Sequence, residues 1–139
     1  MKRKFYEKLL DWKRKSNGRT AVLIDGARRV GKSWIVEEFA RREYKSHLVV
    51  DFGNVHEHLP NLDDFFLYLQ QITRTRLVEG DSLIVFDEVQ KFPRAREAIK
   101  HLVADGRYHY VETGSLISID KNVRDIVVPS EERRIKMFP

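Results

Sequence analysis

Residues 20–33 read TAVLIDGARRVGKS, and this stretch decides the fold. Its last eight residues, 26–33, match the pattern G-x-x-x-x-G-K-[S/T] in full. A short apolar run of β type precedes the pattern, and helical periodicity follows it over residues 32–44. Glycine lets the backbone turn sharply and approach a phosphate group, while the helix N-terminus favours negative charge. The stretch therefore predicts a strand, a phosphate-binding loop and a helix in succession.

This loop predicts binding of ATP or a closely related nucleoside triphosphate. Lys32 is expected to reach the β- and γ-phosphates, and the Ser33 hydroxyl is expected to be a ligand of Mg²⁺. The side chains of Arg28 and Arg29 are expected to point to solvent, and contact with phosphate or a neighbouring subunit is the alternative. The predicted nucleotide-binding residues are Gly26, Ala27, Arg28, Arg29, Val30, Gly31, Lys32, Ser33 and Trp34. The alternative, a chance glycine turn followed by a capping serine, is disfavoured by the flanking strand and helix.

A second motif, LIVFDE at residues 83–88, is an apolar run that ends in two carboxylates. Ligands bind at the carboxyl ends of strands in open α/β sheets. Asp87 is expected to lie on the Mg²⁺ side, and Glu88 is expected to orient and deprotonate the attacking water. Such a run is a weak signal alone, because acidic residues also begin turns. Together with the phosphate loop, it predicts a hydrolytic nucleotide site.

Strand-like and helix-like segments alternate along the chain. Strands are expected at residues 20–25, 47–52, 82–87, 108–113 and 134–138, and helices at 4–15, 32–44, 63–76 and 94–103. Nearly continuous apolar runs are typical of parallel strands that are buried on both faces. The alternation predicts an α/β fold with a parallel sheet between two layers of helices. Residues 118–132 contain no clear element and are expected to form a mobile loop.

The composition favours one globular domain of 139 residues, 42% of them hydrophobic. The absence of cysteine excludes disulfides and thiolate metal sites, and the pair His56 and His58 is expected to lie at the surface. No apolar run approaches the roughly 20 residues that cross a bilayer, so the cytoplasm is the expected location. The net charge of +5 favours a solvated surface with a basic phosphate pocket, and a nucleic-acid partner is the alternative.

The motifs resemble those of the AAA+ ATPase superfamily. More narrowly, the chain resembles predicted bacterial and archaeal ATPases in which an AAA+ core precedes a C-terminal domain of poorly known function. The resemblance rests on GARRVGKS at residues 26–33, DEVQ at 87–90, TGS at 113–115, the opening helix with Trp12, and RIKMFP at 134–139. It covers essentially the whole chain. The first two strings are specific for ATP binding, and the others are suggestive.

The resemblance implies a three-layer α-β-α sandwich of the P-loop NTPase type, with a five-stranded parallel sheet of order 5-1-4-3-2. It also implies a polar sensor residue at the tip of the fourth strand, with Thr113 the first candidate and Ser115 the second. Asn54 matches in position an asparagine that restrains the catalytic glutamate. Arg133 or Arg134 matches an arginine finger. Ordinary turn residues and solvated charges remain the alternatives at these positions.

The resemblance divides the chain into an N-terminal helix at residues 1–18, packed on the core, and an AAA+ ATP-binding core at residues 19–139. Because the chain stops just after the last proposed strand, it is expected to lack a helical lid and a C-terminal domain. Slow or absent turnover is expected for such a fragment.

The predicted function is hydrolysis of ATP to ADP and phosphate, with ATP and Mg²⁺ as cofactors. The predicted catalytic residues are Lys32, Glu88 and Thr113, and the predicted metal ligands are Ser33 and Asp87. A nucleotide-operated switch with little hydrolysis and a DNA-linked ATPase are the alternatives. A small-molecule kinase is a weaker one, because no arginine-rich lid or acceptor pocket is evident. A protein partner or self-association through the core is also expected, and no membrane partner.

Overall fold

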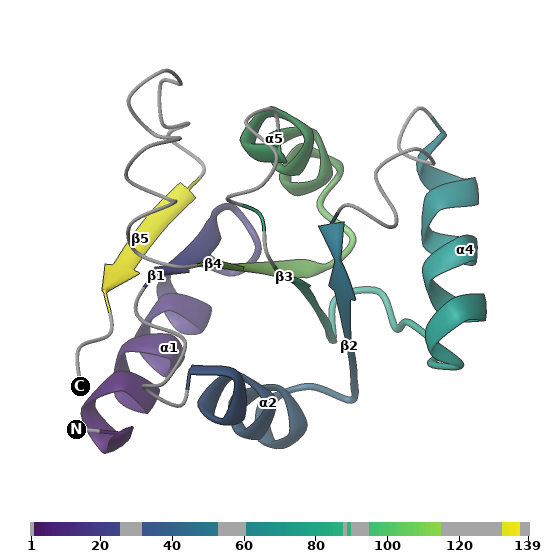
Figure 1. The fold of residues 1–139 in the computed structure, drawn as a ribbon. Coiled ribbons are helices and arrows are strands. Elements are labelled where there is room, and N and C mark those ends of the chain that lie inside the picture. Colours follow the sequence, from purple (N-terminus) through teal and green to yellow (C-terminus); the bar gives the residue numbers. More distant parts are fainter. Residues whose placement is uncertain are drawn as a thin grey trace.

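The computed structural model describes residues 2–25, 32–52, 61–87, 89, 95–114 and 132–136. In chain order, the elements in Figure 1 are α1 (Lys2–Ser16), β1 (Ala21–Asp25), α2 (Lys32–Glu43), β2 (Ser46–Asp51), α4 (Leu62–Thr73), β3 (Ser82–Asp87), α5 (Ala95–Asp105), β4 (His109–Gly114) and β5 (Glu132–Lys136). The alternation of strands and helices expected from the sequence is confirmed.

The strands form one parallel sheet in the order β2-β3-β4-β1-β5. Parallel neighbours need a crossover connection, which explains why helices separate the strands along the chain. β1, which leads into the predicted phosphate loop, lies between β4 and β5. The prediction of an α/β fold with a parallel sheet is confirmed, and the carboxyl ends of all the strands share one edge.

Helices cover both faces of the sheet, and each face has its own apolar core. Figure 1 shows α1 and α2 on one side of the sheet and α5 on the other, with α4 beside β2. On the α2 face, Phe39 and Trp12 pack with Val85 in one buried cluster. On the α5 face, Phe86 and Tyr110 belong to a second cluster. Because alternate residues of a strand point to opposite faces, β3 must be apolar at nearly every position.

The helix α1 is fastened to the core through its apolar side. Leu9 and Trp12 are fully buried, with 0% of their surface exposed. The indole Nε1 of Trp12 donates to the carbonyl oxygen of Thr20 at 3.2 Å, just before β1 begins. Nζ of Lys13 donates to the carbonyl oxygen of Glu43 at 2.6 Å, at the end of α2. These contacts join α1 to both the sheet and the neighbouring helix.

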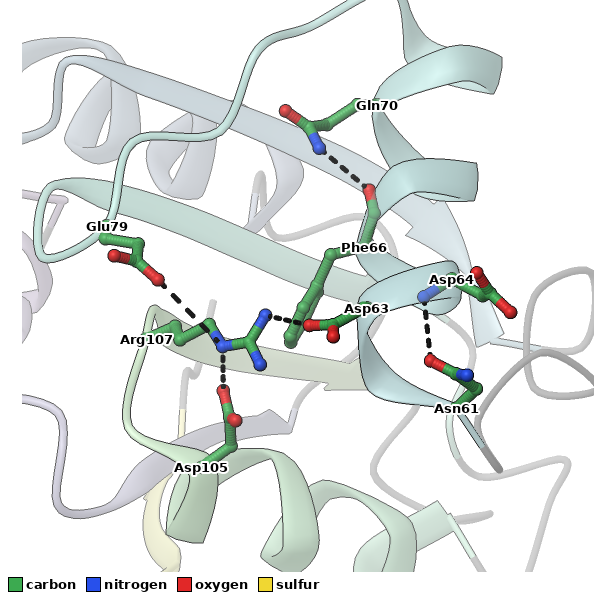
Figure 2. Close-up of polar contacts among 8 residues, drawn as sticks. All are labelled: Asn61, Asp63, Asp64, Phe66, Gln70, Glu79, Asp105 and Arg107. Carbon is green, nitrogen blue, oxygen red and sulfur yellow. Dashed lines mark hydrogen bonds and ion pairs between the residues drawn. The ribbon is translucent and has the colours of Figure 1, made fainter.

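The helix α4 ends earlier than the sequence predicts, at Thr73 instead of residue 76. Arg74 has a φ of 53°, in the left-handed region, and its amide donates to the carbonyl oxygen of Gln70. This conformation is a common way to end a helix. At the other end, the Asn61 side chain accepts from the amide of Asp64 at 3.1 Å, as Figure 2 shows.

The last strand also differs from its prediction. β5 spans Glu132–Lys136, whereas residues 134–138 were expected. Glu132 therefore belongs to the sheet, where it is paired with Ala21 of β1, and not to a loop. The rest of the predicted mobile loop, residues 118–131, lies outside the described residues.

Arg107, just before β4, connects two helices on the α5 face (Figure 2). One of its guanidinium nitrogens lies 2.7 Å from a carboxylate oxygen of Asp63, on α4, and another lies 3.2 Å from Asp105, at the end of α5. Glu79 is at 4.0 Å. The guanidinium carbon also lies 5.3 Å from the centre of the Phe66 ring. The arginine thus links the loop before β4 to both helices.

Candidate functional site

The structure describes the strand and the helix that flank the predicted phosphate loop. β1 ends at residue 25, and α2 begins at Lys32. Residues 26–31 lie outside the described residues, and so do the side chains of Lys32 and Ser33. The strand and helix required by the motif are therefore both present. The start of α2 provides the unpaired backbone amides of a helix N-terminus, which favour a bound anion.

Two predicted site residues, Asp87 and Thr113, meet at the carboxyl edge of the sheet. β3 and β4 are paired in parallel with Phe86 opposite Glu112, so the next residues of each strand lie side by side. The Thr113 hydroxyl donates a hydrogen bond to Oδ1 of Asp87. Thr113 is buried, with 3% of its surface exposed, whereas Asp87 is partly exposed. The hydrogen bond orients a carboxylate that solvent or a ligand can still reach.

The helix α2 lies over this pair. A small pocket of about 40 Å³ is lined by Val36, Glu37, Val49, Val85, Asp87 and Thr113. Val36 and Glu37 lie about one helical turn after the first residues of α2, which is roughly 5–6 Å along the axis. The start of α2 is therefore close to the ends of β3 and β4. The pocket is too small for a nucleotide, since ligand pockets are about 300 Å³ or larger.

The donor set around Asp87 fits Mg²⁺. Among the residues that the structure describes, no group of three or more His, Cys, Asp or Glu side chains could hold a metal ion by itself. Mg²⁺ is usually bound through one or two carboxylates plus phosphate oxygens and water, not by an all-protein cage. The partly exposed carboxylate of Asp87 beside a helix N-terminus agrees with that mode of binding.

Asp51 is a neighbour of this site that the sequence analysis missed. It is the last residue of β2, and the β2–β3 register places it opposite Asp87. Residues that face each other across paired strands lie about 5 Å apart at Cβ, so Asp51 adds negative charge next to Asp87. Its position at the end of an apolar strand, like that of Asp87, was the available signal.

Trp34 lies in a different environment from Asp87. It is the third residue of α2, and 56% of its surface is exposed. It lines an open, mainly apolar groove of about 370 Å³ between α1 and α2, together with Tyr6 and Leu10. The structure thus places Trp34 near the start of α2 but outside the small pocket beside Asp87.

Several predicted residues cannot be placed. Glu88, Ser115, Asn54, His56 and His58 lie outside the described residues. The backbone of Arg133 and Arg134 is part of β5, opposite Val22 and Leu23, but their side chains are not described. The predicted roles of these residues remain predictions.

These features define an α/β protein with a parallel sheet, and comparison with known proteins identifies the family. A family model described as an AAA domain matches residues 18–139. The chain therefore belongs to the AAA domain family, and the predicted resemblance to AAA+ P-loop ATPases is confirmed. No protein of curated function matches the sequence.

A solved structure shows the same fold. The chain is similar to the Aeropyrum pernix ORC2 protein in its ADP form, with a TM-score of 0.56 and 13% sequence identity. The match covers 96% of this chain but only 46% of that one, so the chain spans less than half of its length. At this identity the likeness concerns the fold alone. No helix in the described part of the chain is long and apolar enough to cross a membrane.

Proposed function

We propose that this chain is the ATP-binding core of an AAA+ ATPase. Its site binds ATP with Mg²⁺ and hydrolyses ATP to ADP and phosphate. The observation that carries the proposal is the hydrogen bond from Thr113 to Asp87 at the sheet edge where α2 begins. The strand order β2-β3-β4-β1-β5 supports it, because it corresponds to the order 5-1-4-3-2 of a P-loop NTPase core. The family match and the ADP form of the ORC2 protein also support nucleotide binding.

In this proposal the phosphate loop and the start of α2 hold the triphosphate. The backbone amides of residues 26–33 and the neighbouring Trp34 bind the nucleotide, and Lys32 places its charge beside the β- and γ-phosphates. Ser33 and Asp87 are the protein groups on the metal side. When bound, Mg²⁺ neutralises the charge that develops on the phosphate oxygens.

Hydrolysis needs a group that orients water on the far side of the γ-phosphate. We assign this role to Glu88, which follows Asp87 directly in the sequence. Thr113 acts through Asp87 and is therefore a positioning residue. Its hydroxyl holds one carboxylate oxygen, so the other oxygen keeps a defined direction toward the ligand.

The test compares nucleotide affinity with turnover. Binding of a fluorescent ATP analogue and release of phosphate are measured for the 139-residue chain and for Lys32→Ala, Glu88→Gln and the matched control Lys100→Ala. Lys100 is exposed on α5, away from the site. We expect the wild-type chain to bind ATP and turn it over slowly, Lys32→Ala to lose binding, Glu88→Gln to bind without turnover, and the control to match the wild type. Equal binding and turnover in all four proteins would contradict the proposal.

A nucleotide-operated switch is the second candidate. The hydrogen bond from Thr113 to Asp87 favours a switch. The bond links the ends of two strands to the site, so a change at the bound nucleotide can reach the sheet. A switch would bind ATP through the same residues but hydrolyse it rarely, and a protein partner or a second copy would respond to its state. Rapid multiple turnover by the wild-type chain would exclude this function.

A further inference from the structure

The positive charge of the chain is concentrated at its N-terminal end. Residues 1–19 contain eight lysines and arginines but only two acidic residues. The remaining residues contain 18 basic and 19 acidic side chains and are therefore close to neutral. The whole net charge thus comes from α1 and the turn after it, and a phosphate pocket at residues 26–33 does not account for it.

The structure separates this charge from the apolar side of α1. The side chains of Leu9, Trp12 and Ser16 are buried against the core. Five basic side chains on α1 and the following turn are exposed, and together they form what we call the α1 basic face: Lys4, Lys8, Arg14, Lys15 and Arg19. Lys4 and Lys8 are one turn apart and are in no ion pair among the described residues. Lys15 is paired with Asp11 at 3.3 Å, so the charge of Lys4 and Lys8 is the part of the face that is available to a partner.

The α1 basic face is held in a fixed position. Nε1 of Trp12 is bonded to Thr20, and Nζ of Lys13 is bonded to the end of α2. The Tyr6 hydroxyl donates to a carboxylate oxygen of Glu43 at 3.1 Å. These bonds hold α1 on the sheet and on α2, so the exposed basic residues need no ordering of the helix when a partner binds. Preorganised charge of this kind binds with a smaller entropic cost.

We propose that the α1 basic face binds the phosphate backbone of duplex DNA. Lysine and arginine side chains neutralise backbone phosphates without reading the base sequence, and this gives non-specific, salt-sensitive affinity. A bilayer surface fits less well, because membrane-surface helices insert apolar side chains and those of Leu9 and Trp12 are buried. Single strands fit less well on α1 itself, since Trp12 is buried and the Tyr6 hydroxyl is bonded to Glu43 on α2; the exposed ring of Trp34 belongs to α2.

The experiment measures anisotropy of a fluorescently labelled 20-base-pair duplex with the 139-residue chain at several salt concentrations. The variant Lys4→Gln/Lys8→Gln is compared with the matched control Arg76→Gln/Lys100→Gln, which removes the same charge from exposed sites outside α1. The logarithm of the association constant falls linearly with the logarithm of the salt concentration, and each lost phosphate contact makes this slope less steep by about 0.9. We expect the α1 variant to lose about 1.8 from the slope and to bind at least about tenfold more weakly at 100 mM salt.

The control should keep the wild-type slope, and all proteins should share one thermal midpoint because the replaced side chains are exposed. Equal loss of affinity in the two double variants would overturn the proposal, since net charge alone would then explain binding. Absence of duplex binding at 50 mM salt would overturn it too, as would binding to phosphatidylserine vesicles without binding to the duplex. None of these outcomes depends on whether the chain binds ATP.

Discussion

The hydroxyl of Thr113 donates a hydrogen bond to Oδ1 of Asp87, across the adjacent ends of β4 and β3. The two residues are 26 positions apart in the chain, and the parallel register of the strands brings them together. A buried donor thus holds a partly exposed carboxylate at the sheet edge where ligands bind in this class of fold. The parallel sheet of the family fold therefore places a hydrogen-bonded carboxylate at the edge where a ligand would bind.

Replacing Thr113 by valine should weaken the affinity of the nucleotide-bound chain for Mg²⁺. Valine keeps the shape of threonine but cannot orient Asp87. Loss of a group that orients a metal ligand typically reduces metal affinity or activity by about 10- to 100-fold. We expect a loss in this range when Mg²⁺ is titrated against a bound fluorescent nucleotide. Thr113→Ser keeps the hydroxyl and should recover most of the affinity, and a valine variant equal to the wild type would refute the role.

Acidification should destabilise the fold through His109. Burial, together with the nearby charge of Lys13, lowers the pKa of His109 below its ordinary 6.5, although Asp81 opposes the shift. As the pH falls, the unfolded chain therefore takes up a proton at a higher pH than the folded chain does. The contribution of neutral His109 to the free energy of unfolding is present above pH 6.5 and is lost as the pH falls below it. The Tyr44 hydroxyl and Nδ1 of His109 form a hydrogen bond of 2.7 Å in the folded chain.

The check is urea unfolding at several pH values between 7.5 and 5 (a range chosen around the ordinary histidine pKa of about 6.5). The free energy of unfolding of His109→Gln should change less over this range than that of the wild type. His101, exposed on α5, provides the matched control for replacing a histidine by glutamine. Identical pH profiles for the wild type and His109→Gln would show that His109 does not contribute.

Removing the hydroxyl group from each of two buried tyrosines should have different effects on the stability of the fold. The Tyr110 hydroxyl is buried and has no hydrogen-bond partner in the described part of the chain, and its ring stacks on Phe86 with centroids 6.1 Å apart. Tyr110→Phe should leave stability unchanged or raise it by up to about 1 kcal/mol. Tyr44→Phe removes the bond to His109 and should cost about 1 kcal/mol. Chemical denaturation measures both, and a larger loss for Tyr110→Phe would contradict the assignment.

Arg107→Gln should lower the thermal midpoint by a few degrees. The variant removes the ion pairs to Asp63 and Asp105 and the contact with Phe66. The difference from the wild type should shrink in 1 M salt, because exposed ion pairs are screened. Arg76→Gln, at an exposed arginine outside this cluster, is the matched control. A midpoint difference that does not depend on salt would show that packing on Phe66, not charge, dominates.

Local sequence predicted most of the fold, because the motifs and apolar runs report short-range physics. The strand before the phosphate loop and the buried strand at residues 82–87 were recognisable from composition alone. The early end of α4 was not, since it depends on the left-handed conformation of Arg74, a residue that ordinarily favours helices. Asp51 was missed because its importance comes from the strand opposite, and not from its own neighbours in the chain.

The sequence by itself determined the class of protein, since the spacing G-x-x-x-x-G-K-S between a strand and a helix admits few other functions. It also determined which residues are available to the chemistry. Only the tertiary structure decided which of them meet: it brought Thr113 to Asp87 and placed Asp51 opposite Asp87. The physical reason is that strand register and helix packing depend on contacts between distant segments, which no local pattern encodes.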